Sequence, residues 1–400
     1  MDKTKQYDIC IIGGCGRAGL PLGLAFADRG QKVVLYDINQ SAVEKINKKM
    51  MPFLEEGGPE ILLKVVDLGM LVATSDISVI SMSENLVMVT GTPVDEHQNP
   101  RVQDVMEIIE RILHFLRYDH LLILRSTVYP GITQKISNYL KLKGRQTGVA
   151  FCPERTAEGY ALRELSMLPQ IVSAFDKNSL KRAKALFHIL AKEVVELSPV
   201  EAELAKLFAN AWRYVNFAIS NQFYMIADSY GLDFYRIYEA MVKNYPRLQG
   251  FAKAGLAAGP CLFKDTMQLS AFSNNNFFMG HAAMLINEGL PNYIVGQLKV
   301  KIALKEKIVG ILGMAFKANN DDPRDSLSYK LKKILELEAK EVLCSDVYIS
   351  EPNFVKSQEL VERADIIILA TPHREYKSLD LENKLVVDIW NFFQKGGRIL

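Results

Sequence analysis

Short hydrophobic runs alternate with amphipathic stretches along the first half of the chain. Residues 7–12 (YDICII) and 31–37 (QKVVLYD) flank a glycine turn and a segment with the spacing of a helix. Further hydrophobic runs follow at 86–93, 121–127 and 148–154. Runs this continuous are typical of parallel strands that are covered on both faces. The pattern predicts a doubly wound, Rossmann-like domain over residues 1–195.

The pattern changes at Pro199, where apolar positions recur at helical spacing for about thirty residues, up to Gly231. This predicts a long helix inside a central helical region, residues 196–300. The alternation of strand and helix restarts near Lys307 and predicts a second Rossmann-like domain over residues 301–400. The expected fold is therefore α/β, with two Rossmann-like doubly wound domains joined by a central helical region with a long helix. The apolar face of that helix predicts a seam with another domain or with a second copy of the chain, and we expect a homodimer.

Composition adds few constraints. The 400 residues are 49% hydrophobic and 24% charged, with a formal net charge of +2, so no nucleic-acid or membrane partner is expected. Five scattered cysteines without a CxxC pair predict reduced thiols and no metal site. The sequence shows no secretion signal and no apolar stretch of ~20 residues, which predicts a cytoplasmic protein.

A glycine motif follows the first strand. Gly14, Gly16 and Gly19 form GxGxxG at the start of the next helix, the context in which this motif indicates dinucleotide binding. The three glycines are expected to allow the tight turn, the approach of the pyrophosphate and close packing of helix on strand. Asp37 ends the second strand, where a carboxylate binds ribose hydroxyls and repels a 2′-phosphate. We expect NAD rather than NADP; a flavin, another nucleotide or a plain turn are the alternatives.

Eight segments resemble, in order, the UDP-glucose/GDP-mannose dehydrogenase family over nearly the whole chain. They are GCGRAGLPLG (14–23), PFLEEG (52–57), TPVDEHQNP (92–100), STVYPGIT (126–133), CPERTAEG (152–159), ELAKLFANAWR (203–213), GPCLFKD (259–265) and MAFKANNDDPRDS (314–326). The resemblance implies NAD-dependent oxidation of the C6 alcohol of a UDP-sugar to the uronic acid, in two hydride transfers, for polysaccharide biosynthesis.

The resemblance also implies catalytic roles. Cys261 is the expected nucleophile, because a thiohemiacetal can give up a second hydride and leave a thioester. Asp265 is expected to act with Thr127 on the attacking water, and Glu154 to assist or position hydrolysis; which carboxylate is the base stays open. Cys261 could instead be a small core residue, and the other four cysteines are expected to be structural.

Lys206 and Asn210 lie four residues apart on the predicted long helix, so their side chains leave the same face. In the family these positions stabilise the developing oxyanion, which needs an ammonium and an amide donor. Without a ligand they would be ordinary helix surface residues.

Ligand-binding residues are likewise implied by the resemblance. The expected cofactor-binding residues are Gly14, Gly16, Arg17, Ala18, Gly19, Asp37, Thr92, Thr127, Lys317 and Arg324. The expected substrate-binding residues are Glu154, Arg155, Lys206, Asn210, Arg247, Gly259 and Lys317. The cations suit a diphosphate, which an arginine can grip with two parallel bonds; surface charge is the alternative.

Some positions depart from the family pattern. Alanines replace glycines in AGLAAGPC, FKD replaces the more frequent Pro-Lys-Asp, and Trp390 stands where many relatives carry an arginine. CPER at 152–155 resembles the branch that oxidises UDP-N-acetylhexosamines, whereas GPCLFKD resembles the UDP-glucose branch. We expect a UDP-N-acetylhexosamine, with UDP-glucose as the alternative. A hydroxyacid or hydroxyacyl type of dehydrogenase and a catalytically silent nucleotide-binding protein are the other hypotheses.

Overall fold

The computed structural model describes residues 5–91, 95, 101–257 and 259–399. The chain forms two compact units, residues 1–209 and 210–400, and each has its own sheet and hydrophobic core. The second unit holds most of the predicted helical region and the predicted C-terminal domain. The domain limits at 195 and 300 therefore stay predictions.

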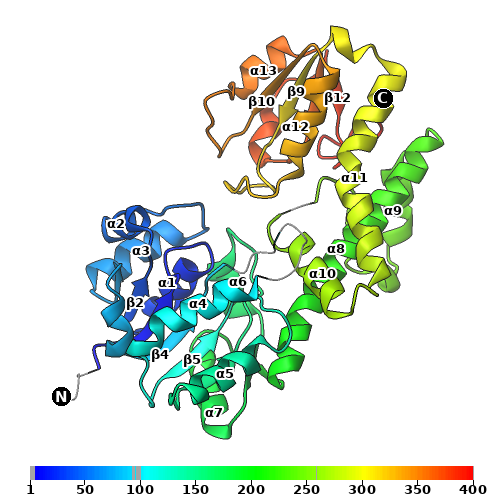
Figure 1. The fold of residues 1–400 in the computed structure, drawn as a ribbon. Helices are drawn as coiled ribbons and strands as arrows, with labels where there is room; N and C mark the ends of the chain where they lie inside the picture. Colours follow the sequence, from blue (N-terminus) through cyan, green and yellow to red (C-terminus); the bar gives the residue numbers. More distant parts are fainter. Residues whose placement is uncertain (1–4, 92–94, 96–100, 258, 400) are drawn as a thin grey trace. The chain divides into compact units, whose positions relative to one another are not determined.

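An eight-stranded sheet forms the centre of the first unit (Figure 1). Its order is β3-β2-β1-β4-β5-β6-β7-β8, and its pairs are parallel except β6 with β7. From β3 to β6 this is the strand order of dinucleotide-binding sheets. The strands are β1 (Tyr7–Ile12), β2 (Val33–Tyr36), β3 (Leu71–Thr74), β4 (Ser83–Met88), β5 (Leu121–Leu124), β6 (Gly148–Phe151), β7 (Gln170–Ala174) and β8 (Val194–Glu196).

Helices follow the strands as the pattern predicts. They bury apolar faces on the sheet, so that every residue of β2 and β5 is buried. The helices are α1 (Gly19–Asp28), α2 (Gln40–Asn47), α3 (Gly58–Asp67), α4 (Val102–Ile112), α5 (Ile132–Leu142), α6 (Ala161–Met167) and α7 (Lys177–His188), with 3-10 turns η1 (Ile77–Met82) and η2 (Leu113–Phe115).

The predicted long helix is present as α8 (Pro199–Ser229), 31 residues long. It begins with proline, which suits the first helical turn, and Gly231 follows it at φ +66°. The other helices of this region are α9 (Phe234–Val242), α10 (Leu262–Phe272) and α11 (Phe278–Lys301), with the 3-10 turn η3 (Pro246–Leu248). Within the described part of the chain, the helices are each too short or too polar to cross a membrane.

A four-stranded parallel sheet, in the order β10-β9-β11-β12, completes the second unit. Its central strands repeat the arrangement of β2-β1-β4 in the first sheet, and the expected fold class is confirmed. The elements are η4 (Leu304–Glu306), β9 (Ile308–Leu312), α12 (Leu327–Glu338), β10 (Glu341–Ser345), α13 (Ser357–Arg363), β11 (Ile366–Leu369), η5 (Arg374–Ser378) and β12 (Leu385–Val387).

Candidate functional site

The glycine turn after β1 is built as a phosphate-binding turn requires. A Cβ on Gly14 would come within 2.7 Å of the Ile11 carbonyl, and one on Gly19 within 2.6 Å of the Gly13 carbonyl. A Cβ on Gly16 would meet nothing closer than 3.7 Å. The first and third glycines of the motif are therefore demanded by packing, and the second leaves open space beside the backbone.

The left-handed conformation of this turn falls on Gly13, at φ +79°, directly before the first glycine of the motif. The Ala18 that precedes α1 makes no side-chain cap, and the first turn of α1 carries no acidic residue. Its positive end therefore suits an anion. Arg17 lies beside this turn, with its guanidinium 5.0 Å from the centre of the Phe53 ring.

Asp37 follows β2 and faces the turn. Its Oδ2 accepts a 2.9 Å hydrogen bond from the Cys15 N–H, and its Oδ1 accepts one of 3.0 Å from the Asn39 N–H. The side chain is only half-buried. Its carboxylate is thus oriented by the backbone and still accessible to ribose hydroxyls.

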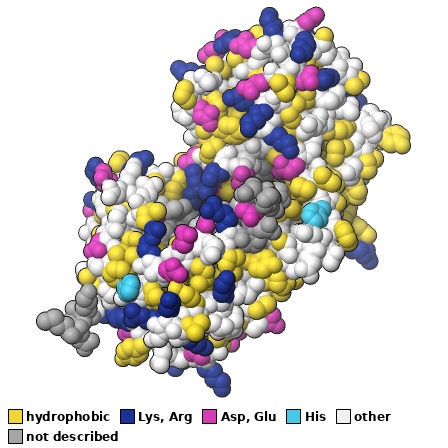
Figure 2. All heavy atoms as spheres, viewed as in Figure 1, with side chains coloured by type: hydrophobic (Ala, Val, Ile, Leu, Met, Phe, Trp, Pro, Cys, Tyr) yellow, Lys and Arg dark blue, Asp and Glu magenta, His cyan; other side chains and the backbone are white. Residues whose placement is uncertain are grey.

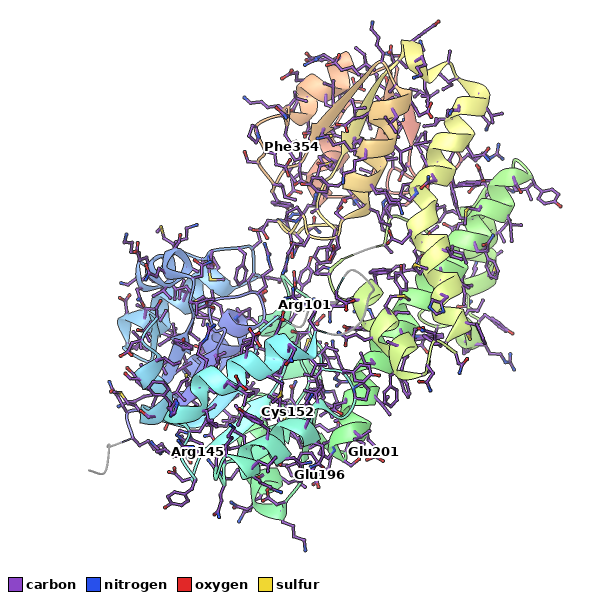
Figure 3. All side chains as sticks on the ribbon, viewed as in Figure 1. Arg101, Arg145, Cys152, Glu196, Glu201 and Phe354 are labelled. Atoms are coloured by element: carbon purple, nitrogen blue, oxygen red, sulfur yellow. The ribbon has the colours of Figure 1, made fainter. Side chains whose placement is uncertain are left out.

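A buried arginine organises the next strand ends. Arg125 follows β5 and is fully buried, and its Nε donates to Glu154 Oε2 at 2.9 Å. Its remaining bonds go to the Cys152 carbonyl (3.1 Å) and Gln170 Oε1 (3.1 Å), and it stacks on Phe187 at 4.8 Å. Cys152 is labelled in Figure 3, at the end of β6 within the first unit. Glu154 is thereby fixed at the carboxyl edge of the sheet.

The electrostatics of Glu154 follow from these partners. Burial by itself would raise its pKa, but the charge of Arg125, the Thr156 N–H bond and the charge of Lys206 outweigh burial. The pKa of Glu154 therefore lies below its ordinary value, and the group stays a carboxylate. Its Oε1 also accepts the N–H groups of Arg155 and Thr156, at 2.7 and 2.9 Å. The first unit thus brings Lys206 and Glu154 into electrostatic contact.

Lys206 is placed by the first turn of α8. The start of α8 is bonded to the start of α5. The fully buried Glu203 accepts hydrogen bonds from the Gly131 N–H (2.6 Å) and the Thr133 N–H (2.9 Å). A carboxylate at a helix N-terminus is stabilised by the free N–H groups and the helix dipole. This contact fixes α8 one turn before Lys206. Thr127 lies two residues after Arg125 and is half-buried.

The cysteine loop lies in the second unit. Cys261 precedes α10 directly and is exposed, and the Asp265 N–H donates to its carbonyl at 2.9 Å. Asp265 is fully buried, and its carboxylate accepts from Asn210 Nδ2 at 2.5 Å and from Lys264 Nζ at 2.6 Å. The second unit therefore brings Asn210 and Lys264 together on Asp265, which lies one helical turn after Cys261.

The other four cysteines differ from Cys261 in burial. Cys10, Cys15, Cys152 and Cys344 are buried, as the sequence predicts. Burial raises the pKa of Cys10, Cys15 and Cys152 to about 12 and that of Cys344 to about 11. These thiols stay protonated near neutral pH, so they are poor nucleophiles.

The loop before Cys261, which is expected to bind the substrate, packs closely against two aromatic side chains. Gly259 has φ +114°, and a Cβ there would come within 2.5 Å of the Phe316 ring. A Cβ on Gly255 would come within 2.4 Å of Trp390, whose Nε1 donates to the Ala370 carbonyl at 3.0 Å. Trp390 thus packs against the backbone of the loop before Cys261.

The remaining predicted ligand residues are dispersed. Arg155 donates to the Pro169 carbonyl in the first unit, and Arg247 is exposed in η3. In the second unit, Lys317 is half-buried, and Arg324 forks onto Asp322 at 2.6–3.0 Å. Thr92 lies outside the described residues.

Sequence reasoning missed Arg125 and Lys264. Arg125 ends the hydrophobic run LLIL, and a charged residue there signals a buried ion pair. Lys264 was part of the FKD segment, but its bond to the neighbouring Asp265 needs side-chain directions that the sequence does not give.

Comparisons with known proteins show the family of the chain. The chain matches three domains of the UDP-glucose/GDP-mannose dehydrogenase family: the NAD binding domain at residues 7–191, the central domain at 200–288 and the UDP binding domain at 310–395. A UDP-N-acetyl-D-mannosamine dehydrogenase from Pyrococcus horikoshii is 30% identical over 96% of this chain and 95% of its own. The chain belongs to the UDP-glucose/GDP-mannose dehydrogenase family.

Solved structures of the family extend the comparison. One of a UDP-D-ManNAc dehydrogenase from Pyrococcus horikoshii is 29% identical, with a TM-score of 0.89 and 96% of both chains covered. One of a UDP-glucose dehydrogenase from Pyrobaculum islandicum is 25% identical, with a TM-score of 0.88 over 97% of this chain and 95% of that one.

Membership of the family confirms two predictions from the sequence. The match to the NAD binding domain shows that the cofactor is NAD. The chain is an NAD-dependent oxidoreductase of the nucleotide-sugar dehydrogenase class. The hydroxyacid alternative is set aside, because the family match includes a UDP binding domain.

Proposed function

We propose that the chain oxidises the C6 alcohol of a UDP-N-acetylhexosamine to the uronic acid. The observation that carries this proposal is the exposed Cys261 one helical turn before the buried Asp265, which Asn210 and Lys264 both bind. The relative from Pyrococcus horikoshii supports the N-acetylated substrate. UDP-glucose is the second candidate, because a solved UDP-glucose dehydrogenase matches the fold almost equally well.

The residues of the glycine turn fit the cofactor. Gly14, Gly16, Arg17, Ala18 and Gly19 would hold the pyrophosphate, since Gly16 leaves open space and the start of α1 is uncapped. Asp37 would bind the ribose. NAD⁺ would supply the hydride acceptor for each oxidation, so that one turnover consumes two molecules of NAD⁺.

Lys206 and Asn210 would stabilise the oxyanion that forms at the sugar oxygen. The two side chains lie one turn apart on α8, an arrangement that presents an ammonium and an amide on one face. Glu154 keeps a negative charge near Lys206. Asp265 fixes the amide of Asn210 through a 2.5 Å bond. Donors fixed in advance stabilise charge that develops in the transition state.

Cys261 would carry the covalent chemistry. After the first oxidation its thiolate sulfur bonds to the aldehyde carbon and gives a thiohemiacetal. Loss of the second hydride from that carbon leaves a thioester. Water then attacks, its oxygen becomes part of the carboxylate, and the carbon–sulfur bond breaks to return the cysteine.

We assign the hydrolysis step to Asp265 rather than Glu154. The pKa of Glu154 lies below its ordinary value, which makes Glu154 a weak base. Asp265 is four residues from Cys261 on the same helix start. Glu154 would instead hold Lys206 and the backbone at Arg155, and Thr127 would help to order the water.

The nucleotide sugar would be bound by residues of several loops. Because Gly259 has no side chain, the loop before Cys261 can lie close to Phe316. The cations of these loops match the charge of a diphosphate. These cations are Arg155, Arg247, Lys317 and Arg324. We place the protein in the cytoplasm, where it would supply UDP-uronic acid for polysaccharide synthesis.

The homodimer is also a proposal, and it rests on α8. Exposed hydrophobic side chains recur along one stripe of this helix: Phe208 (55%), Trp212 (63%), Ile219 (37%), Phe223 (41%) and Ile226 (50%). In the second unit, hydrophobic side chains also gather over α9 and α11 (Figure 2). A long exposed apolar stripe is typical of an interface.

Light scattering tests the homodimer and should give about twice the 45.0 kDa chain mass. Trp212→Glu should give monomers, while Arg213→Glu, beside the stripe, should not.

The proposed reaction is tested by offering UDP-N-acetylglucosamine, UDP-N-acetylmannosamine, their galacto epimers and UDP-glucose, and by following NADH absorbance. We expect NADH release with an N-acetylated sugar and none with Cys261→Ser. Cys344→Ser is the matched control, because that thiol is buried. Preference for UDP-glucose would select the second candidate, and no reaction with any sugar would refute the proposal.

A further inference from the structure

A buried histidine joins two loops at the carboxyl edge of the second sheet. His373 lies four residues after β11 and is fully buried. Its Nδ1 accepts a 2.9 Å hydrogen bond from the Asn319 N–H, and its Nε2 lies 3.1 Å from Asp346 Oδ2. Because Nδ1 accepts, the ring proton of the neutral histidine must lie on Nε2, which donates to the carboxylate.

Asp346 is the fixed end of this bridge. It follows β10, its side chain is fully buried, and it accepts the N–H groups of Met314 (2.6 Å) and Ala315 (3.0 Å). Burial by itself would raise the pKa of Asp346, but the bond from His373 and the backbone N–H bonds hold the pKa below its ordinary value. The rings of Tyr348 and Tyr376 contact the imidazole edge-on, at 5.0 and 5.4 Å, and restrict its rotation.

The other end of the bridge is the loop 314–326. Asn319 has φ +55°, a conformation that costs a non-glycine residue energy. Its N–H bonds to His373, and its Oδ1 accepts from the Arg374 N–H at 3.1 Å. The backbone N–H and the side-chain oxygen of Asn319 thus both bond to the segment that carries His373. Lys317 lies two residues before Asn319.

We infer that His373 is a positioning residue for the nucleotide sugar. The imidazole bonds both to Asp346, which backbone N–H groups hold in place, and to Asn319. It thereby holds the loop so that the Lys317 ammonium lies where a diphosphate can bind. This inference rests on the proposed function in one respect, the role of Lys317. Loss of the bridge should weaken binding of the UDP-sugar more than binding of NAD, because Asp37 and the glycine turn, the main expected NAD-binding residues, belong to the other unit.

Three variants of the full chain separate the two bonds of the imidazole. His373→Ala removes both bonds. His373→Asn keeps an acceptor near the position of Nδ1, and His373→Gln keeps a donor near the position of Nε2. We expect the KM for the UDP-sugar to rise about tenfold or more in His373→Ala, with little change in kcat or in the KM for NAD. His373→Asn should restore most of the loss, because the Asn319 bond reaches the loop.

His120 provides the matched control. It is also fully buried, and its Nδ1 accepts from the Arg117 N–H at 3.1 Å, in the first unit. His120→Ala should lower the melting temperature without raising the KM for the UDP-sugar. An equal rise of both KM values in His373→Ala, or no rise at all, would overturn the inference.

Amide hydrogen exchange tests the bridge without any assay of activity. Exchange in residues 314–326 should be faster in His373→Ala and in His373→Gln than in the wild type, and unchanged in His120→Ala. Unchanged exchange in this loop would refute the positioning role. If the wild type reduces no NAD and binds no UDP in calorimetry, the proposed function fails, while faster loop exchange would still support the bridge. If His373→Ala does not fold, the Asn and Gln variants give the same comparison.

Discussion

The two parallel sheets place an aspartate at the same point and use it differently. Asp37 follows β2 and Asp346 follows β10, and each accepts backbone N–H groups from the turn after the neighbouring strand. Asp37 is half-buried, whereas the side chain of Asp346 is fully buried. The first can therefore bind a ligand, and the second holds a loop. Position in the fold is shared, and burial decides the role.

The turns themselves differ in the same sense. In the first sheet α1 begins seven residues after the last residue of β1, and the glycines keep the turn tight. In the second sheet the loop from Gly313 to Ser326 separates β9 from α12. The longer loop carries Lys317 and Arg324. The first arrangement would bring backbone to a pyrophosphate, and the second would present charged side chains.

The largest contrast should come from removing each aspartate. Asp346→Ala leaves His373 and four backbone N–H groups without their acceptor, those of Met314, Ala315, Tyr348 and Ile349. We expect the free energy of unfolding to fall by about 3–5 kcal/mol in urea. Asp37→Ala should cost about 1 kcal/mol and raise the KM for NAD instead. Equal losses of stability would contradict the difference in role.

The glycines give the next largest effect. Gly19→Ala forces a Cβ to within 2.6 Å of the Gly13 carbonyl and should cost about 1–3 kcal/mol. Gly16→Ala has room in the protein and should leave the melting temperature nearly unchanged, yet weaken NAD binding. Calorimetric titration with NAD and a thermal melt of both variants check this. A strongly destabilised Gly16→Ala would show that the open space is not real.

The carboxylates predict how stability depends on pH. The folded-state pKa values of Glu154 and Asp346 lie below the ordinary values of 4.5 and 3.8. Each group therefore stabilises the folded chain above its ordinary pKa, and this contribution is lost as the pH falls through the folded-state value. Glu154→Gln should be less stable than the wild type at pH 7, and the gap should narrow below about pH 4.5. A difference in stability that does not change in acid would contradict the role of Arg125 in lowering the pKa of Glu154.

The smallest expected change concerns cofactor choice. Asp37→Ser removes the charge that repels a 2′-phosphate and should improve the ratio of kcat/KM for NADP to that for NAD by about tenfold. Ser345→Ala, at the end of β10 beside Asp346, is the control in the other sheet and should leave this ratio unchanged. An unchanged ratio in Asp37→Ser would remove Asp37 from the ribose site.

The sequence predicted the fold well, because buried strands and amphipathic helices leave strong periodic patterns. The strand runs at 7–12 and 121–127 and the helix after Pro199 are present at nearly the expected places. The positions of Gly16, Asp37 and Cys261 were also expected, since each depends on local order along the chain.

The polar network of the site could not be predicted in the same way. Arg125 bonds to Glu154 and Gln170 across 29 and 45 residues, and His373 bonds to Asn319 across 54. Such pairs depend on side-chain directions at the ends of neighbouring strands, which hydrophobic periodicity does not encode. The positive φ of Gly13 could not be read from the motif either, because Gly13 lies one residue before the first of its three glycines.

The number of NADH molecules released per UDP-sugar tests the thiol-based reaction most directly. It is measured by letting a limiting amount of sugar react to completion with excess NAD and identifying the product by mass spectrometry. The wild type should release two NADH and form the carboxylate. One NADH with an aldehyde product, or two NADH from Cys261→Ser, would contradict the role of the cysteine.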